Sequence, residues 1–156
     1  MRTAIMGAGS LGIIIGALIT RKGVPVELID VDKANVDALN ANGATVTGFM
    51  DLNVPVKACT PDQMTGKYDL VLLLTKQWNN PVALPALLPF LNAESPVCPL
   101  QTGLPDESAA SYVGKARTHG GTVGFGATRR GPGGPRRATT GDVEDADVLP
   151  LRQMPT

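Results

Sequence analysis

Three glycines near the start of the chain have the spacing of a phosphate-binding loop. Gly7, Gly9 and Gly12 follow the short apolar run 3–6 and open an apolar stretch that begins at Ser10. In such a loop the first glycine permits a tight turn, the second lets a pyrophosphate approach the backbone, and the third lets the helix pack on the strand. The helix N-terminus adds N–H groups and about half a positive charge. The residues predicted to bind a dinucleotide here are Gly7, Ala8, Gly9, Ser10, Leu11 and Gly12. A turn that serves only packing is the alternative.

An acidic residue stands where the ribose of a bound dinucleotide would lie. Asp30 directly follows the β-branched and apolar stretch Val26–Ile29, about 20 residues after the glycines. A carboxylate at this position accepts hydrogen bonds from ribose hydroxyls and repels a 2′-phosphate, so we predict NADH in preference to NADPH. Lys33 close by would soften that repulsion. A turn residue at the end of the strand is the other interpretation of Asp30.

Alternating buried strands and helices are needed to hold these residues together. A strand over 3–6, a helix from Ser10 to about Arg21 and a strand over 26–29 complete a βαβ unit. Further along the chain, the sequence predicts a helix over 34–42 with a solvated polar face, a hairpin of 45–47 with 52–56, a strand over 68–74, a helix starting at Asn80 and Pro81, a strand over 97–100 and a helix from Leu104. We therefore predict an α/β fold, a Rossmann-type doubly wound parallel sheet, as one domain over residues 1–128.

Composition excludes several other classes of protein. The 156 residues have a formal net charge of zero, and no dense basic run lies within the apolar, patterned part, so nucleic acid is not an expected partner. The apolar run 11–19 is preceded by glycines and is too short to span a bilayer, so we expect a cytoplasmic protein without a membrane segment. Cys59 and Cys98 are expected in the core, and with His119 as the one histidine no metal site is predicted.

The character of the chain changes after about Thr128. Residues 129–137 contain many Arg, Gly and Pro residues and no large apolar side chain, and 138–156 hold only scattered ones. We predict that 129–156 form an irregular, disordered tail. Its basic run could contact an anionic partner, but a solvated tail is the favoured interpretation.

Three segments together resemble a known family over residues 1–128. They are 5–12, 69–76 and 100–105, and they are similar to the ketopantoate reductases (2-dehydropantoate 2-reductases) and the related D-2-hydroxyacid dehydrogenases. The resemblance implies that Lys76 lines the cofactor and substrate cleft. The alternative interpretation of Lys76 is a solvated lysine at the surface. At the position of Thr102 the family usually has asparagine. Threonine offers a hydroxyl there but lacks the two amide donors of asparagine. An acid at the position of Asp30 is similar to the NADH-using branch of these proteins. Trp78 is expected to pack in the interior, with stacking near the cleft as the alternative.

The resemblance also implies a reaction, in which NAD(P)H passes a hydride to the keto carbon of 2-dehydropantoate or a related 2-oxo acid, as in pantothenate biosynthesis. The family's proton-donating lysine and substrate-binding glutamate lie on a second, helical domain that this sequence does not contain. We therefore predict an incomplete copy and assign no catalytic residue. The alternatives are a module that binds a dinucleotide without turnover, an NAD-dependent D-2-hydroxyacid dehydrogenase and a methyltransferase that uses S-adenosylmethionine. The oligomeric state stays open.

Overall fold

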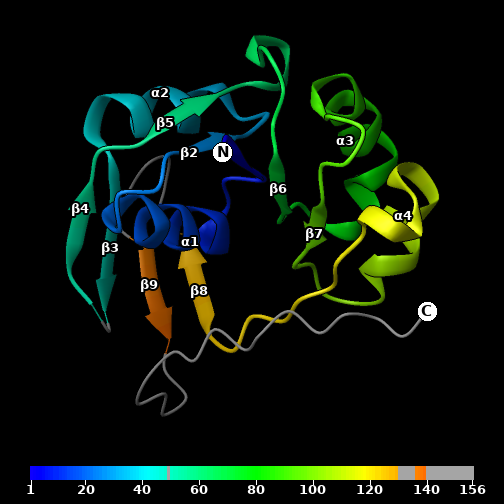
Figure 1. The fold of residues 1–156 in the computed structure, drawn as a ribbon. Coiled ribbons are helices and arrows are strands. Elements are labelled where there is room, and N and C mark those ends of the chain that lie inside the picture. The colour runs from blue at the N-terminus through cyan, green and yellow to red at the C-terminus, as the bar shows by residue number, and fades with distance from the viewer. Residues whose placement is uncertain (49, 130–135, 140–156) are drawn as a thin grey trace.

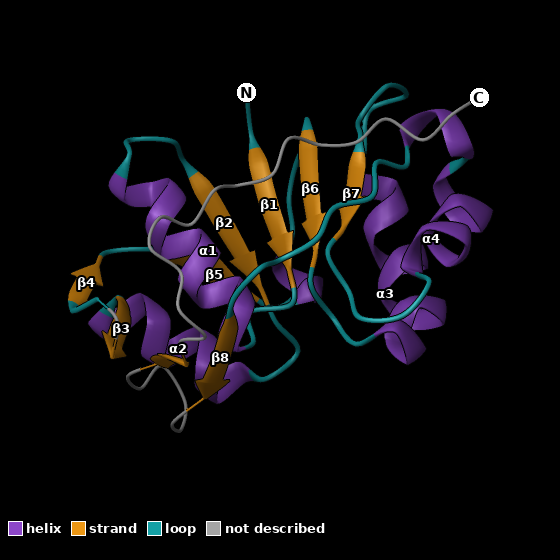
Figure 2. Cartoon of the chain, turned by 90° about the horizontal axis from the view of Figure 1, so that it is seen from below, coloured by secondary structure: helices purple, strands orange, loops and turns teal. Residues whose placement is uncertain are grey.

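The protein is built on a five-stranded parallel sheet, seen from below in Figure 2. The computed structural model describes residues 1–48, 50–129 and 136–139. The strand order is β5-β2-β1-β6-β7. The strands are β1 (Thr3–Met6), β2 (Val26–Ile29), β5 (Lys57–Cys59), β6 (Leu70–Leu73) and β7 (Val97–Pro99). The chain winds outward from β1 in one direction and then from β6 in the other, which confirms the doubly wound prediction. The point of reversal, between β1 and β6, is where such sheets bind ligands.

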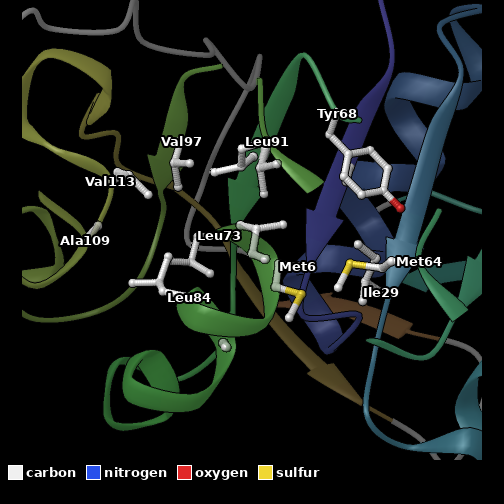
Figure 3. Packing of buried hydrophobic residues seen from close by; sticks show 14 of the residues in the cluster. Met6, Ile29, Met64, Tyr68, Leu73, Leu84, Leu91, Val97, Ala109 and Val113 are labelled. Carbon is white, nitrogen blue, oxygen red and sulfur yellow. The ribbon is translucent and has the colours of Figure 1, made fainter. Parts of the chain in front are cut away.

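Helices cover both faces of this sheet. The α-helices are α1 (Ser10–Arg21), α2 (Lys33–Asn42), α3 (Asn80–Leu87) and α4 (Pro105–Val113). Single 3₁₀ turns are η1 (Pro61–Gln63), η2 (Gln77–Asn79), η3 (Leu88–Phe90) and η4 (Lys115–Arg117). Because side chains alternate along a strand, Met6 packs in a core with residues of α3 and α4 (Figure 3), whereas Ile5 packs in a second core with residues of α1 and α2. None of the helices in the described part of the chain is long and apolar enough to cross a bilayer.

A second, smaller sheet packs beside α1. Its order is β4-β3-β9-β8, from β3 (Ala44–Gly48), β4 (Leu52–Val54), β8 (Gly126–Arg129) and β9 (Arg136–Thr139). The antiparallel pair β3 and β4 confirms the predicted hairpin. Contacts of α1 with both sheets explain why that helix is apolar on all sides (Figure 1).

The strand β9 lies inside the segment 129–156 that was predicted to be irregular. It pairs in parallel with β3 and antiparallel with β8. Strand pairing uses backbone groups, so a segment without large apolar side chains can still add to an available sheet edge. The rest of that prediction, at 130–135 and 140–156, lies outside the described residues.

A buried carboxylate lies toward the amino ends of the parallel strands. Glu27 in β2 accepts hydrogen bonds from the Tyr68 hydroxyl at 3.0 Å and the Cys59 thiol at 3.1 Å. It also forms ion pairs with Arg2 at 3.0 Å and Lys57 at 3.5 Å. Burial raises the pKa of the Glu27 carboxyl, but these donors and charges outweigh burial and hold the pKa below its ordinary value of 4.5. The cluster therefore joins four separate segments through one ionised side chain.

Candidate functional site

The glycine loop follows β1, and its three glycines meet different surroundings. Gly7 has a φ of +107°, and a Cβ added there would lie 2.6 Å from the backbone nitrogen of Thr75, in the loop after β6. A Cβ at Gly12 would lie 2.0 Å from the carbonyl oxygen of Gly7. Apart from Gly9 itself and its chain neighbours, a Cβ at Gly9 would have no heavy atom of the described residues within 4 Å. The loop is thus closed tightly by its first and third glycines and is open at its second.

The open glycine is also the N-cap of α1. As a glycine, Gly9 offers no capping side chain, and the first turn, which contains Ser10 and Leu11, carries no acidic residue. The N–H of Ile13 donates to the carbonyl of Gly9 at 3.0 Å, which starts the helical hydrogen-bond ladder. Neither the N-cap nor the first turn therefore supplies a group that neutralises the first N–H groups and the positive end of the helix dipole, and both favour an anionic group there.

Asp30 lies beside this loop and is fixed in place by neighbours that the sequence did not reveal. One carboxylate oxygen, Oδ1, accepts the backbone N–H of Asp32 at 2.9 Å, and the other, Oδ2, accepts the side-chain amide of Asn35 at 3.1 Å. The same amide nitrogen donates to the carbonyl of Ala8 in the glycine loop at 2.9 Å. Asn35 is fully buried, so the expectation of a solvated polar face on α2 is wrong at this residue.

Lys33, which follows Asp30 closely in the sequence, forms an ion pair within its own helix. Its ammonium lies 2.6 Å from the carboxylate of Asp37, one turn along α2, and both side chains are exposed. An exposed lysine paired in this way offers less charge to a phosphate near Asp30. Among the described residues, the ion pair of Lys33 is thus with Asp37 and not with Asp30.

The loops after β6 and β7 bring two further predicted residues to the same edge of the sheet. Lys76 and Thr102 are both exposed. Between them, the amide nitrogen of Gln101 donates to Thr75 at its carbonyl (2.7 Å) and hydroxyl (3.0 Å) oxygens, and to Oδ1 of Asn80 at 2.8 Å. Asn80 is fully buried and returns a hydrogen bond to Gln101 at 3.1 Å. This network ties the loop that carries Lys76 to the loop that carries Thr102.

Other side chains considered in the sequence have simpler surroundings. Trp78 is 77% exposed, so its predicted packing in the interior is wrong; it lies in the single turn η2, where few side chains surround it. Both cysteines are buried, as predicted. Burial raises the pKa of the Cys59 thiol to about 12 and that of Cys98 to about 11. His119 lies in a loop and donates its backbone N–H to Val97 at 3.0 Å.

Comparison with known proteins identifies the family to which this arrangement belongs. A family profile described as "Ketopantoate reductase PanE/ApbA" matches residues 3–147. The chain belongs to the ketopantoate reductase family. The match extends beyond the boundary at residue 128 that the resemblance alone indicated. The chain carries the N-terminal, NAD(P)-binding domain of that family, and the match removes the methyltransferase alternative.

Curated members of the ketopantoate reductase family are longer than this chain. A 2-dehydropantoate 2-reductase of Pyrococcus abyssi is 34% identical over 135 residues, which are 85% of this chain and 43% of that protein. The enzyme of the same name from Streptococcus pyogenes serotype M1 is 28% identical over 134 residues, 85% of this chain and 44% of that protein. The chain thus spans less than half the length of these relatives.

Solved structures of other proteins share the fold. A 2-dehydropantoate 2-reductase from Geobacter metallireducens superposes with a TM-score of 0.78 at 31% identity, covering 88% of this chain and 46% of that one. D-Mandelate dehydrogenase in a ternary structure with NADH and anilino(oxo)acetate superposes with a TM-score of 0.82 at 21% identity, covering 90% and 46%. The second likeness concerns the fold alone.

Proposed function

We infer that the chain binds NADH and forms the cofactor-holding part of a reductase for 2-dehydropantoate or a related 2-oxo acid. One observation carries this proposal: the open backbone at Gly9 coincides with the uncapped N-terminus of α1, beside the carboxylate of Asp30. These three features match the needs of a pyrophosphate and a ribose. Together they support the binding of a dinucleotide at this edge of the sheet.

The roles of the remaining site residues follow from their places at the carboxyl ends of the strands. The N–H groups of the first turn of α1 bind the pyrophosphate, and Asp30 accepts hydrogen bonds from the ribose. When bound, the nicotinamide supplies the hydride that reduces the keto carbon. Lys76 offers a positive charge to the carboxylate of the oxo acid, and the hydroxyl of Thr102 lies on the loop beside it. As an NADH-dependent enzyme with two free thiols, the protein is proposed to act in the cytoplasm.

A second candidate is a module that binds NADH without turnover. It is favoured by the features that the structure provides at this site, the open backbone at Gly9, the N-terminus of α1 and the carboxylate of Asp30, because these need a dinucleotide and no substrate. The D-2-hydroxyacid dehydrogenase alternative rests on Asp30 and its expected preference for NADH, because likeness to D-mandelate dehydrogenase at 21% identity carries no argument about substrate.

Binding and turnover of the purified chain distinguish these candidates. NADH binding is measured by fluorescence, and turnover is measured by the loss of NADH absorbance. The two substrates, tested separately, are 2-dehydropantoate and the aromatic 2-oxo acid that corresponds to mandelate. Oxidation of NADH with 2-dehydropantoate supports the reductase, and oxidation only with the aromatic acid supports the dehydrogenase. Binding without oxidation supports the module, whereas a folded chain that does not bind NADH refutes all three.

A further inference from the structure

The side chain of Asn35 connects the two halves of the proposed cofactor site. It lies in the first turn of α2 and is fully buried. Its amide nitrogen lies 2.9 Å from the carbonyl oxygen of Ala8 and 3.1 Å from Oδ2 of Asp30. An amide nitrogen carries two hydrogens, so one atom can donate to both acceptors at once. The glycine loop after β1 and the acid after β2 are therefore joined by a single side chain.

These contacts fix the orientation of Asp30 and leave room for a ligand. An ionised carboxylate has about four acceptor positions. Oδ1 uses one for the N–H of Asp32 at 2.9 Å, and Oδ2 uses one for Asn35. With two donors holding different oxygens, the plane of the carboxylate is set, and about two acceptor positions remain for the vicinal hydroxyls of a ribose.

We propose that Asn35 is a positioning residue that sets the cofactor specificity of the site. It holds the carboxylate of Asp30 where the adenosine ribose meets it, so that NADH is selected over NADPH. This inference rests on the proposed function, because it needs NADH at the glycine loop and Asp30. Without Asn35, the N–H of Asp32 is the one donor to the carboxylate that the hydrogen bonds of the described residues leave. The carboxylate then rotates, which weakens its bonds to the ribose and relaxes its repulsion of a 2′-phosphate.

The selectivity ratio, the Kd for NADPH divided by the Kd for NADH, is the quantity that this role changes. A hydrogen bond to a charged group is commonly equivalent to about tenfold in affinity or more. We expect Asn35→Ala to lower the ratio by about tenfold, mainly through weaker NADH binding. A residue that only supports packing would weaken both cofactors equally and leave the ratio unchanged.

Calorimetric titrations of four proteins test this role: the wild type, Asn35→Ala, Asp30→Ala and the double variant. Since Asn35 acts through Asp30, adding Asn35→Ala to Asp30→Ala should leave the ratio unchanged. The matched control is Asn40→Ala on the same helix. The side chain of Asn40 forms two hydrogen bonds with the backbone of Ala58 (2.8 and 2.9 Å). It should keep the wild-type ratio even if the protein becomes less stable.

Each outcome of the titrations decides the question. The proposal is supported if the selectivity ratio is lower in Asn35→Ala than in the wild type and is the same in the double variant as in Asp30→Ala. A wild-type preference for NADH that survives Asn35→Ala overturns this inference alone. A wild type that binds both cofactors equally overturns it as well, and a folded wild type that binds neither overturns the proposed function too. If Asn35→Ala does not fold, Asn35→Ser is titrated instead, and the ratio is independent of the folded fraction.

Discussion

Replacing Gly9 with alanine adds one methyl group at the N-cap of α1. The backbone there has φ −76° and ψ −162°, which an L-residue adopts without strain. Apart from Gly9 and its chain neighbours, no heavy atom of the described residues would lie within 4 Å of the added Cβ. Alanine stabilises by about 0.4–1 kcal/mol through the unfolded chain, and it loses a similar amount as a poorer N-cap than glycine. The free energy of unfolding should therefore stay within about 0.5 kcal/mol of the wild type.

In the proposed complex, the same methyl group would occupy the space that the pyrophosphate needs. Displacing a phosphate from the helix N-terminus forfeits up to about 2 kcal/mol from the dipole and about 1.5–3 kcal/mol for each lost charge-assisted hydrogen bond. A net loss of about 2–4 kcal/mol corresponds to NADH binding that is weaker by about 30- to 1,000-fold. Gly9→Ala should thus lose cofactor affinity while it keeps its stability.

The matched control is Gly12→Ala, three residues further along. Its Cβ would lie 2.0 Å from the carbonyl oxygen of Gly7, a backbone atom that cannot rotate away. Overpacking typically costs about 1–3 kcal/mol, and separating the helix from the loop should lower the free energy of unfolding by at least that amount. This variant should therefore lose stability and NADH affinity together. Urea denaturation followed by circular dichroism gives stability, and calorimetry gives affinity. If Gly9→Ala binds NADH as tightly as the wild type, the pyrophosphate does not lie against Gly9 and the reasoning is refuted.

Three other substitutions address the rest of the structure. Because folding lowers the pKa of Glu27, the contribution of its charge to stability declines as the pH falls below about 4.5 and is lost as the pH passes the folded-state pKa. Glu27→Gln should therefore flatten the acid limb of stability in pH-dependent denaturation, whereas Glu94→Gln, at an exposed residue, should keep the wild-type slope. Gln101→Ala removes the donor between two loops and should lower the free energy of unfolding in urea by about 1–3 kcal/mol; a change below about 0.5 kcal/mol would contradict the network's role. Lys76→Met should weaken binding of a 2-oxo acid to the NADH complex by about tenfold in calorimetry, and Lys67→Met, at the opposite edge of the sheet, should have no effect.

Local patterns were sufficient to predict the elements that carry the glycine loop. The bounds of β1, α1 and β2 agree with their apolar runs and with the glycines and basic residues between them. The short strand β5 was not predicted, because Lys57–Cys59 has only three residues and forms a strand by pairing with β2. The strand β9 was missed for the same reason, since it depends on the edge of β3 rather than on its own side chains.

The site was predicted less completely than the fold. Gly7, Asp30, Lys76 and Thr102 all lie in loops at the carboxyl ends of the parallel strands, and that placement follows from the order of the elements. The roles assigned to them as cofactor ligands stay predictions. Asn35 was interpreted as a solvated helical residue because its two acceptors come from other loops, which no periodicity in α2 reveals.

The hydrogen-bond network around Gln101 and the donors around Glu27 were missed for a similar reason. Each one joins segments that are more than 20 residues apart. A polar residue in an apolar run, such as Glu27 between Val26 and Leu28, is the one signal that could have pointed to a buried partner set.

Calorimetric titration of the wild-type chain with NADH and then NADPH tests the central claim most directly. The protein should bind NADH at one site per chain and bind it more tightly than NADPH, because the pyrophosphate is proposed to lie against the glycine loop and the ribose beside Asp30. A chain that circular dichroism shows to be folded, but that releases no heat of binding with either cofactor, would contradict the account.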